Sequence, residues 1–353
     1  KEKLDRLEPR FQVTASGEPW FDLAVSYATS SGEVIPAAEV QRLLRGGQNG
    51  VRLKNGRLAL LDTGAVEELE EILVDAAPEQ RGGAYRMDAA QAGYFLASAA
   101  GQPAWRVEAP AAWRERVQRQ TGGAKLECPP LGPLEAVLRD YQKQGVAWLR
   151  FLRENGFGGV LADEMGLGKT LQALAYVASR HTPHPTPHTP TLVVCPTSLV
   201  FNWQAEAAKF TPRLRVVALH GADRHARFDE VRGADLVITS YALIRRDAER
   251  YRGLEFDTVI LDEAQHIKNR QTRNAQAVKA VRCRHRLVLT GTPLENSVLD
   301  LWSLFDFLMP GYLGGAQDFR DRYETPIVKA RDKTVMERLG RRLRPFILRR
   351  TKR

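Results

Sequence analysis

The chain has 353 residues, 43% of them hydrophobic and 27% charged, which is the composition of an ordinary globular protein long enough for two domains. No apolar run approaches the roughly 18 residues of a transmembrane helix, and the charged first residues do not resemble a secretory signal, so we expect no membrane partner. Three scattered cysteines without C-x-x-C spacing predict neither a disulfide framework nor a zinc site, and they favour a reducing, cytoplasmic compartment.

The net charge of +10 is concentrated at the end of the chain. From Lys329 onward there are eleven basic and two acidic residues, which leaves the rest of the chain nearly neutral. A basic segment of this kind fits an anionic partner such as nucleic acid, and a solvated linker accounts for it equally well. Because the first residue is Lys1 rather than Met, we expect the chain to be a fragment of a longer protein.

The first 130 residues predict a small α+β accessory domain. Alternation and helical periodicity indicate a strand, a hairpin and two helices, at 20–25, 51–60, 65–76 and 89–99. The Asn55-Gly56 pair is expected to supply the positive φ angles of the hairpin turn. Nothing in this region has catalytic spacing, so the sequence assigns it no role.

A Pro- and Gly-rich stretch at 128–133 marks the boundary to a second domain, over residues 131–353. Short, continuous apolar runs alternate there with helical segments, at 160–162, 192–195, 216–219, 236–239, 259–261 and 287–289. Such runs are typical of parallel strands covered on both faces, so we expect an α/β domain with a doubly wound parallel sheet. The proline-rich tract 181–190 predicts a surface loop within it.

A glycine-rich turn follows the first of these strands and opens a helix at 170–179. Backbone N–H groups of the Gly166-Leu167-Gly168 turn are suited to phosphate oxygens, Lys169 to the β- and γ-phosphates, and the Thr170 hydroxyl to Mg²⁺. The usual phosphate-loop pattern has a glycine where this chain has Asp163, so this motif alone is of moderate specificity.

Two carboxylates, Asp262 and Glu263, end the buried strand at 259–261. A carboxylate there is costly unless it serves a cation or a proton transfer, so we expect Asp262 to hold Mg²⁺, partly through water, and Glu263 to activate the attacking water. The alternative, that the pair only caps the next helix, is worth about 0.5–1 kcal/mol. Lys169, Asp262 and Glu263 are therefore the expected catalytic residues.

A third block, Leu289–Asn296, lies at the end of the last predicted strand, at the edge where α/β sheets bind ligands. Thr290 and Thr292, on either side of Gly291, are expected to hydrogen-bond the two carboxylates and to sense a γ-phosphate.

These three blocks resemble the signature motifs of the Swi/Snf family, within helicase superfamily two, and further blocks follow in the family's order. Asp163 is common in that family. The resemblance covers residues 134–353 and implies the first RecA-like lobe of an ATP- and Mg²⁺-dependent motor that tracks along double-stranded DNA and remodels protein–DNA complexes. It implies that Gln142 reads the adenine edge and that Gln265 shares in the coupling. Residues 1–130 are similar to the accessory domain that precedes the motor in bacterial members.

The resemblance also implies a set of DNA-contacting residues, which would hold backbone phosphates rather than read bases. They are Pro196, Thr197, Ser198, Asn202, Trp203, Thr239, Ser240, Tyr241, Lys268 and Asn269. For Trp203 and Tyr241, packing in the core is at least as good an explanation.

In this superfamily a second RecA-like lobe completes the ATP site and supplies an arginine finger, and no late arginine of this chain lies in a second-lobe motif. We therefore expect slow hydrolysis by this chain alone. Two other functions stay open: a non-hydrolysing, DNA-binding regulatory module and a helicase that separates strands. The intact Lys169, Asp262 and Glu263 speak against the first, and 267–269 and 293–296 against the second.

Overall fold

In the computed structural model the chain divides into two compact units. The first contains Lys1–Lys125 together with Gly340–Arg342, and the second contains Leu126–Leu339 and Leu343–Arg353. The structure describes residues 5–15, 20–120, 126–180, 189–291 and 298–352, so most of the predicted loop at 181–190 lies outside the described residues. No helix in this described part combines the length and apolar character that a bilayer crossing requires.

The second unit is built on a sheet in which every described pairing is parallel. Its seven described strands have the order β11-β12-β10-β13-β14-β9-β15. They are β9 (Gly159–Leu161), β10 (Thr191–Cys195), β11 (Val216–Ala218), β12 (Leu236–Ser240), β13 (Glu255–Asp262), β14 (Arg282–Leu289) and β15 (Ile347–Leu348). The six predicted strands are all present, and the short edge strand β15 was not predicted.

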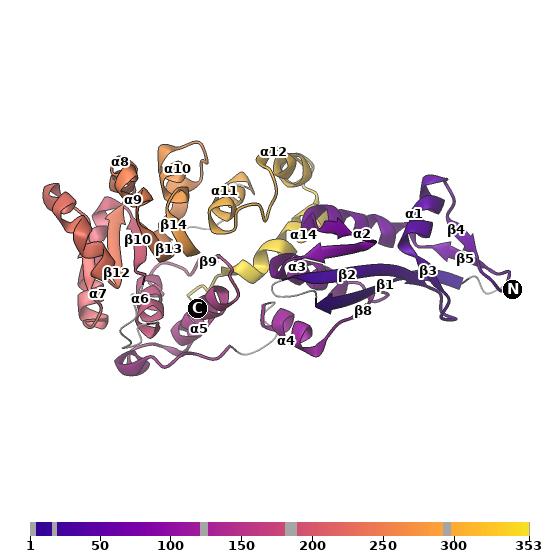
Figure 1. The fold of residues 1–353 in the computed structure, drawn as a ribbon, viewed down its shortest axis with the longest axis horizontal. Helices are drawn as coiled ribbons and strands as arrows, with labels where there is room; N and C mark the ends of the chain where they lie inside the picture. The colour runs from indigo at the N-terminus through magenta and orange to yellow at the C-terminus, as the bar shows by residue number, and fades with distance from the viewer. Residues whose placement is uncertain (1–4, 16–19, 121–125, 181–188, 292–297, 353) are drawn as a thin grey trace. The chain divides into compact units, whose positions relative to one another are not determined.

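Helices cover both faces of this sheet (Figure 1). Helices α5, α6 and α7 follow one another on one face, and α8, α10 and α11 on the other, as right-handed crossovers between parallel strands require. The doubly wound α/β fold expected from the sequence is thus confirmed. The helices are α5 (Asp140–Glu154), α6 (Lys169–Ser179), α7 (Val200–Phe210), α8 (Tyr241–Arg246), α9 (Ala248–Arg252), α10 (Arg273–Lys279), α11 (Val298–Leu308), α12 (Ala316–Phe319), α13 (Thr325–Ala330) and α14 (Lys333–Leu343).

The first unit has a mixed sheet of eight described strands, with the path β4-β5-β1-β2-β7-β6 and with β3 beside β2 and β8 beside β1. Its strands are β1 (Asp5–Ala15), β2 (Phe21–Ala28), β3 (Val34–Pro36), β4 (Gly50–Arg52), β5 (Leu58–Leu61), β6 (Glu79–Arg81), β7 (Ala84–Met87) and β8 (Arg106–Glu108). Its helices are α1 (Ala37–Arg45), α2 (Thr63–Ala76), α3 (Ala89–Ala100) and α4 (Ala111–Gln120). This is the α+β fold that the sequence predicts.

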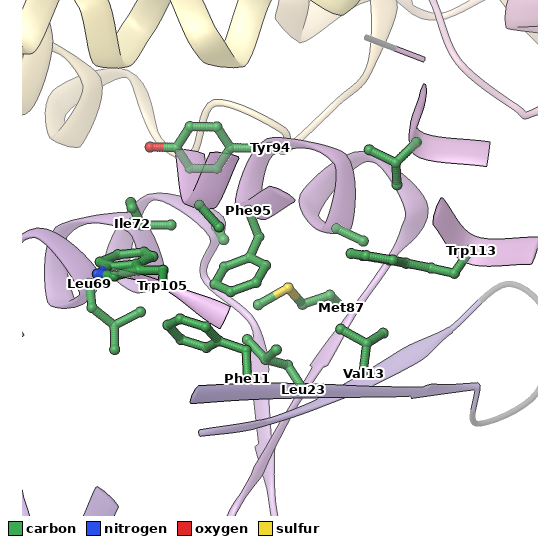
Figure 2. Close-up of a cluster of buried hydrophobic side chains, with 14 residues drawn as sticks. Phe11, Val13, Leu23, Leu69, Ile72, Met87, Tyr94, Phe95, Trp105 and Trp113 are labelled. Carbon is green, nitrogen blue, oxygen red and sulfur yellow. The ribbon is translucent and has the colours of Figure 1, made fainter. Parts of the chain in front are cut away.

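Five of the fourteen buried side chains in the larger core of the first unit are aromatic (Figure 2). The Phe11 ring lies 5.0 Å from that of Phe95 and 5.2 Å from that of Trp105, between centroids. Strand β1, helix α3 and the loop before β8 therefore meet at one aromatic cluster, and such pairs add about 0.5–1.5 kcal/mol beyond their buried area. The unit has its own core, independent of the parallel sheet.

The predicted hairpin is present, since β4 and β5 pair antiparallel, but the expectation for its turn was wrong in one respect. Only Gly56 of the Asn55-Gly56 pair has a positive φ, of 80°. The Asn55 side chain instead accepts a hydrogen bond from the Arg57 N–H at 3.0 Å, which stabilises the turn without a left-handed Asn.

Candidate nucleotide-binding site

Three neighbouring strands bring the sequence motifs together at one edge of the parallel sheet. Asp262 of β13 lies beside Leu289 of β14, and Leu289 lies beside Leu161 of β9. The Thr290 N–H donates to the Leu161 carbonyl at 3.1 Å, so the row continues past the strand ends. The glycine-rich turn after Leu161, the acidic end of β13 and the Thr290 block therefore share one edge.

The glycine-rich turn adopts a backbone that only glycine accepts readily. Gly166 and Gly168 have φ angles of +89° and +77°, in the left-handed region, and α6 begins directly after them at Lys169. A Cβ on Gly168 would also lie 2.5 Å from the Gln142 Nε2. The turn thus leads into a helix N-terminus, where free N–H groups and the helix dipole favour phosphate.

Lys169 is half-buried in this turn, and its Nζ donates to the Asp163 carbonyl at 2.7 Å. Burial lowers the pKa of Lys169, while the charges of Glu263, Asp262 and Asp163 act in the opposite direction. The lysine therefore lies within the field of both strand-end carboxylates. Thr170, the next residue, is half-buried in the first turn of α6.

Asp262 is buried and is held by neutral donors. Its Oδ2 accepts from the Trp203 Nε1–H at 2.9 Å, and its Oδ1 accepts from the Glu263 N–H at 2.9 Å. Burial raises the pKa of the Asp262 carboxyl, and although the Trp203 hydrogen bond acts against this, the net shift is upward. A carboxylate in this setting gains from a cation placed beside it.

Glu263 carries backbone strain at the same point. Its φ is +50°, which places it among the three described non-glycine residues with positive φ. Its side chain is only half-buried. A left-handed conformation at a non-glycine residue costs on the order of 1–3 kcal/mol, and such strain concentrates at functional sites.

The predicted coupling residues are divided by the structure. Thr290 is buried, and a Cβ on Gly291 would lie 3.4 Å from the Lys169 Nζ, so both adjoin the glycine-rich turn. Gln265 is exposed, after the acidic pair. Thr292 lies outside the described residues, as does the rest of its block through Asn296.

Gln142 lies at the start of α5 and packs on the same turn. Its Nε2 donates to the Leu167 carbonyl at 3.2 Å, and its Oε1 accepts from the Arg139 N–H at 2.9 Å. Tyr141 adds a second hydrogen bond to the Leu167 carbonyl, at 3.1 Å. Within the chain, Gln142 therefore supports the turn, and its amide has a second N–H and a second oxygen lone pair with which to read an adenine edge.

The donors at this edge fit a magnesium nucleotide. The two left-handed glycines leave the backbone open to phosphate, Lys169 supplies a cation, and Thr170 and Asp262 supply hard oxygen ligands. Hydroxyl and carboxylate oxygens are what Mg²⁺ prefers, usually with waters retained. Glu263 beside them is the one carboxylate of the group whose side chain is partly open to solvent.

The residues expected to contact DNA fall into two groups. Four have exposed side chains: Thr197, Ser198, Asn202 and Asn269. Two next to them, Pro196 and Lys268, are half-buried. The Asn202 Nδ2 donates to Glu206 at 3.0 Å, and the Lys268 Nζ lies 3.3 Å from an Asp300 carboxylate oxygen. These six remain available as surface contacts, since a side-chain amide and an ammonium each have more than one N–H donor.

The other four are in the interior, and the expectation that they contact DNA does not fit their surroundings. Trp203 and Tyr241 are 1% and 3% exposed, and Thr239 and Ser240 are fully buried. Tyr241 donates its hydroxyl to the Asp262 carbonyl at 2.8 Å, and the Ser240 hydroxyl caps α8 by accepting from the Leu243 N–H. For Thr239 the sequence carried a signal of burial, since this residue ends the apolar strand run 236–239.

Two residues of the site were missed by sequence reasoning. Gln172 on α6 donates to the Asp163 carboxylate at 3.1 Å, and Arg350 contacts the same carboxylate at 2.9 and 2.5 Å. The substitution of Asp163 for a glycine was a signal that the turn needs a positive partner. The identity of that partner, Arg350, which lies 187 residues further along the chain, could not be read from the sequence.

The fold and this edge together define a RecA-like nucleotide-binding lobe of the phosphate-loop class: a doubly wound parallel sheet with a glycine-rich turn, a lysine and an acidic strand end in one row. Comparison with known sequences agrees and is more specific. The SNF2-related domain matches residues 141–353, and the chain belongs to that family.

Similar proteins occur in a bacterium and a yeast. The Bacillus subtilis protein YwqA, whose name describes an ATP-dependent helicase/translocase, is 43% identical over 247 residues, which cover 68% of this chain and 26% of YwqA. The TATA-binding protein-associated factor mot1 of Schizosaccharomyces pombe is 40% identical over 243 residues, or 62% of this chain and 12% of that factor.

A solved structure shares the fold. The Sulfolobus solfataricus SWI2/SNF2 ATPase core in complex with double-stranded DNA superimposes with a TM-score of 0.58 and 43% identity, over 65% of this chain and 47% of that core. The chain therefore spans 26% and 12% of the two related sequences and about half of the solved core.

Proposed function

We propose that this chain is the ATP-binding lobe of an ATP-driven translocase that tracks along double-stranded DNA and remodels protein–DNA complexes. The observation that carries the proposal is the single row of Leu161, Leu289 and Asp262, which brings the phosphate turn to the acidic strand end. Membership of the SNF2-related family supports the same activity, as does the likeness to an ATPase core that binds duplex DNA.

Each residue at the edge has a distinct task in phosphoryl transfer. The turn at Gly166–Gly168 and Lys169 bind and orient the triphosphate, and Thr170 and Asp262 hold Mg²⁺, Asp262 partly through water. When bound, the ion neutralises charge that develops on the β- and γ-phosphate oxygens. Glu263, whose side chain is partly open to solvent, orients a water and accepts its proton.

Coupling to DNA is assigned to the residues that link the strand ends. Thr290 and Gly291 adjoin the turn, and with Thr292 and Gln265 they respond to the γ-phosphate. Trp203 joins this group in place of its predicted DNA contact, because it extends from α7 to the Asp262 carboxylate. A shift of α7 on DNA would thereby reach the magnesium ligand.

DNA is held at the carboxyl edge of β10 and after β13, through Pro196, Thr197, Ser198, Asn202, Lys268 and Asn269. Hydroxyl and amide groups dominate this set, so binding is to phosphates, largely independent of sequence and weakened by salt.

Efficient turnover requires a second RecA-like lobe. The chain corresponds to 47% of the solved ATPase core, and an arginine supplied from outside a phosphate-loop lobe raises the rate by about 10³–10⁵ in related reactions. The 353-residue chain is expected to bind ATP·Mg²⁺ weakly and to hydrolyse it far below about 1 s⁻¹, even with duplex DNA. Turnover at or above that rate would contradict the requirement.

The full-length protein provides the test of the function. ATP hydrolysis is measured without DNA and with double-stranded or single-stranded DNA, in the native protein and in Glu263→Gln and Lys169→Ala variants. A translocase loses hydrolysis in Glu263→Gln and keeps ATP binding, whereas Lys169→Ala loses both. A regulatory binding module would show no functional change in Glu263→Gln.

A second assay separates the two kinds of motor. Removal of a third strand from a triplex reports movement along an intact duplex, and displacement of one strand of a forked duplex reports strand separation. The proposed function requires triplex removal that depends on ATP and little strand separation. The opposite pattern would identify a strand-separating helicase.

A further inference from the structure

The carboxylate of Asp163 is an unusual component of a phosphate-binding turn. It is fully buried, and it stands where the general phosphate-loop pattern has a glycine. Lys169 donates to the carbonyl of this residue, so the carboxylate lies close to the group that binds the β- and γ-phosphates. A buried negative charge there disfavours an incoming triphosphate unless another group compensates it.

Arg350 supplies that compensation. Its Nε and Nη2 donate to the two Asp163 carboxylate oxygens at 2.9 and 2.5 Å, in the paired geometry that suits guanidinium and carboxylate. The Nη2 also donates to the Gln172 Oε1 at 2.7 Å, and the Nη1 donates to the Tyr141 carbonyl. One side chain therefore joins the turn to both α5 and α6.

Gln172 completes the arrangement from the first turns of α6. While its Oε1 accepts from Arg350, its Nε2 lies within hydrogen-bonding distance of the Asp163 carboxylate, the Leu167 carbonyl and the Gly168 carbonyl, at 3.1 to 3.3 Å. Gln172 is fully buried. Arg350 thus acts on both the acidic and the glycine-rich parts of the turn.

The backbone around Arg350 runs beside the same turn. Strand β15 pairs with β9 at Ile347 and Leu348, and the Ala162 N–H then donates to the Leu348 carbonyl at 2.7 Å. The Glu164 N–H donates to the Arg350 carbonyl at 2.9 Å, and the Lys352 N–H donates to the Glu164 carboxylate at 2.8 Å. We call Ile347–Lys352 the terminal segment; it extends the sheet into the first half of the phosphate turn.

We propose that Arg350 is a positioning residue for ATP. By neutralising Asp163 and fixing it to Gln172, Arg350 keeps the phosphate turn open to a triphosphate. ATP affinity therefore depends on the terminal segment being paired with β9 and the phosphate turn. The inference rests on the proposed ATP binding and adds a partner outside the three sequence blocks. Because the coupling between ATP binding and this pairing is reciprocal, bound ATP also stabilises the paired terminal segment.

The test is the affinity of the 353-residue chain for ATP·Mg²⁺ and ADP·Mg²⁺, measured by isothermal titration calorimetry. Arg350→Gln leaves Asp163 uncompensated, Asp163→Asn removes the charge, and the double variant replaces the ion pair by two amides. Arg349→Gln is the matched control, since its exposed side chain carries the same charge one residue away. Urea unfolding without nucleotide reports stability separately.

Arg350→Gln is expected to weaken ATP binding at least about tenfold, and ADP binding by less, because repulsion grows with the phosphate charge. The double variant recovers affinity to within about threefold of Asp163→Asn, as expected for neighbours that act as a pair. Arg349→Gln stays within about twofold of the native chain. A role confined to stability would lower the urea midpoint without separating ATP from ADP.

Two outcomes overturn the inference: ATP affinity of Arg350→Gln equal to that of the control, or a double variant no better than Arg350→Gln. Should Arg350→Gln fail to fold, Arg350→Lys keeps the charge and loses the paired geometry, and ATP affinity equal to the native value then overturns it. A native chain whose ATP affinity equals that of Lys169→Ala contradicts the proposed function itself, and with it this inference.

Discussion

Strand β13 carries a buried aspartate near each of its ends, and opposite kinds of partner hold the two carboxylates. Asp257, near the start, lies 2.8 Å from an Arg153 nitrogen and 2.6 Å from an Arg180 nitrogen. Asp262, at the end, is held by the neutral N–H groups of Trp203 and Glu263. Asp257 is thus paired with two cationic side chains, whereas the donors that hold Asp262 at the other edge of the sheet are neutral.

The pKa shifts of the two carboxyls follow from these partners. At Asp257, burial raises the pKa, but the hydrogen bond from Arg153 and the charge of Arg180 outweigh it, so the net shift is downward. At Asp262, burial dominates and the pKa is raised. Asp257 therefore stabilises the lobe, and Asp262 gives up stability for a site that can bind a metal ion.

The largest expected effect is on catalysis. Asp262→Asn in the full-length protein should lower DNA-stimulated ATP hydrolysis at least about a hundredfold, because a magnesium ligand contributes several kcal/mol to the transition state. Steady-state ATPase assays over a range of Mg²⁺ concentrations check this. Asp257→Asn is the matched control on the same strand, and a comparable catalytic loss there would remove the distinction between the two edges.

The next effect is on stability, and here Asp257 rather than Asp262 is the residue whose loss is costly. Asp257→Asn should lower the free energy of unfolding of the chain by about 2–3 kcal/mol, less than for a fully buried pair because both arginines are partly exposed. Urea denaturation followed by circular dichroism measures the change. A loss under about 0.5 kcal/mol would mean that water replaces the ion pair without penalty.

A smaller effect is expected from the donor that holds Asp262. Trp203→Phe keeps an aromatic ring and removes the N–H that donates to Asp262 at 2.9 Å, and the loss of such a bond costs about 1–3 kcal/mol. DNA-stimulated hydrolysis should fall about tenfold while DNA affinity, measured by fluorescence anisotropy, is kept. A loss of DNA affinity with normal hydrolysis would return Trp203 to the DNA-contacting group.

The smallest effect is the pH dependence of stability. Since the folded-state pKa of Asp257 is lowered, its contribution is present above the unfolded value of about 3.9 and is lost as pH falls through the folded pKa. The stability gap between the native chain and Asp257→Asn should therefore narrow below about pH 4.

At Asp262 the folded-state pKa is raised, so the charged carboxylate lowers the stability of the folded chain at pH 7. Asp262→Asn should therefore raise the urea midpoint at pH 7.

Local pattern was enough to predict the α/β class, six strands of the parallel sheet and the three blocks of the nucleotide site. Apolar runs, glycine turns and strand-end carboxylates are each recognisable within a few residues of sequence. Parallel strands then place their carboxyl ends at one edge of the sheet. The strand β15 was missed because two apolar residues, Ile347 and Leu348, give no period to detect.

What the amino-acid order could not disclose is which polar groups meet across the fold. Trp203, Ser240 and Tyr241 lie in blocks that suggested a DNA surface, with core packing an equal explanation for the two aromatics, and the structure places all three in the interior. The pairing of Arg350 with Asp163 joins residues 187 positions apart, and that of Arg153 with Asp257 joins residues 104 apart. Burial and long-range pairing depend on the assembled sheet and its helices, so the tertiary structure alone assigned these residues their partners.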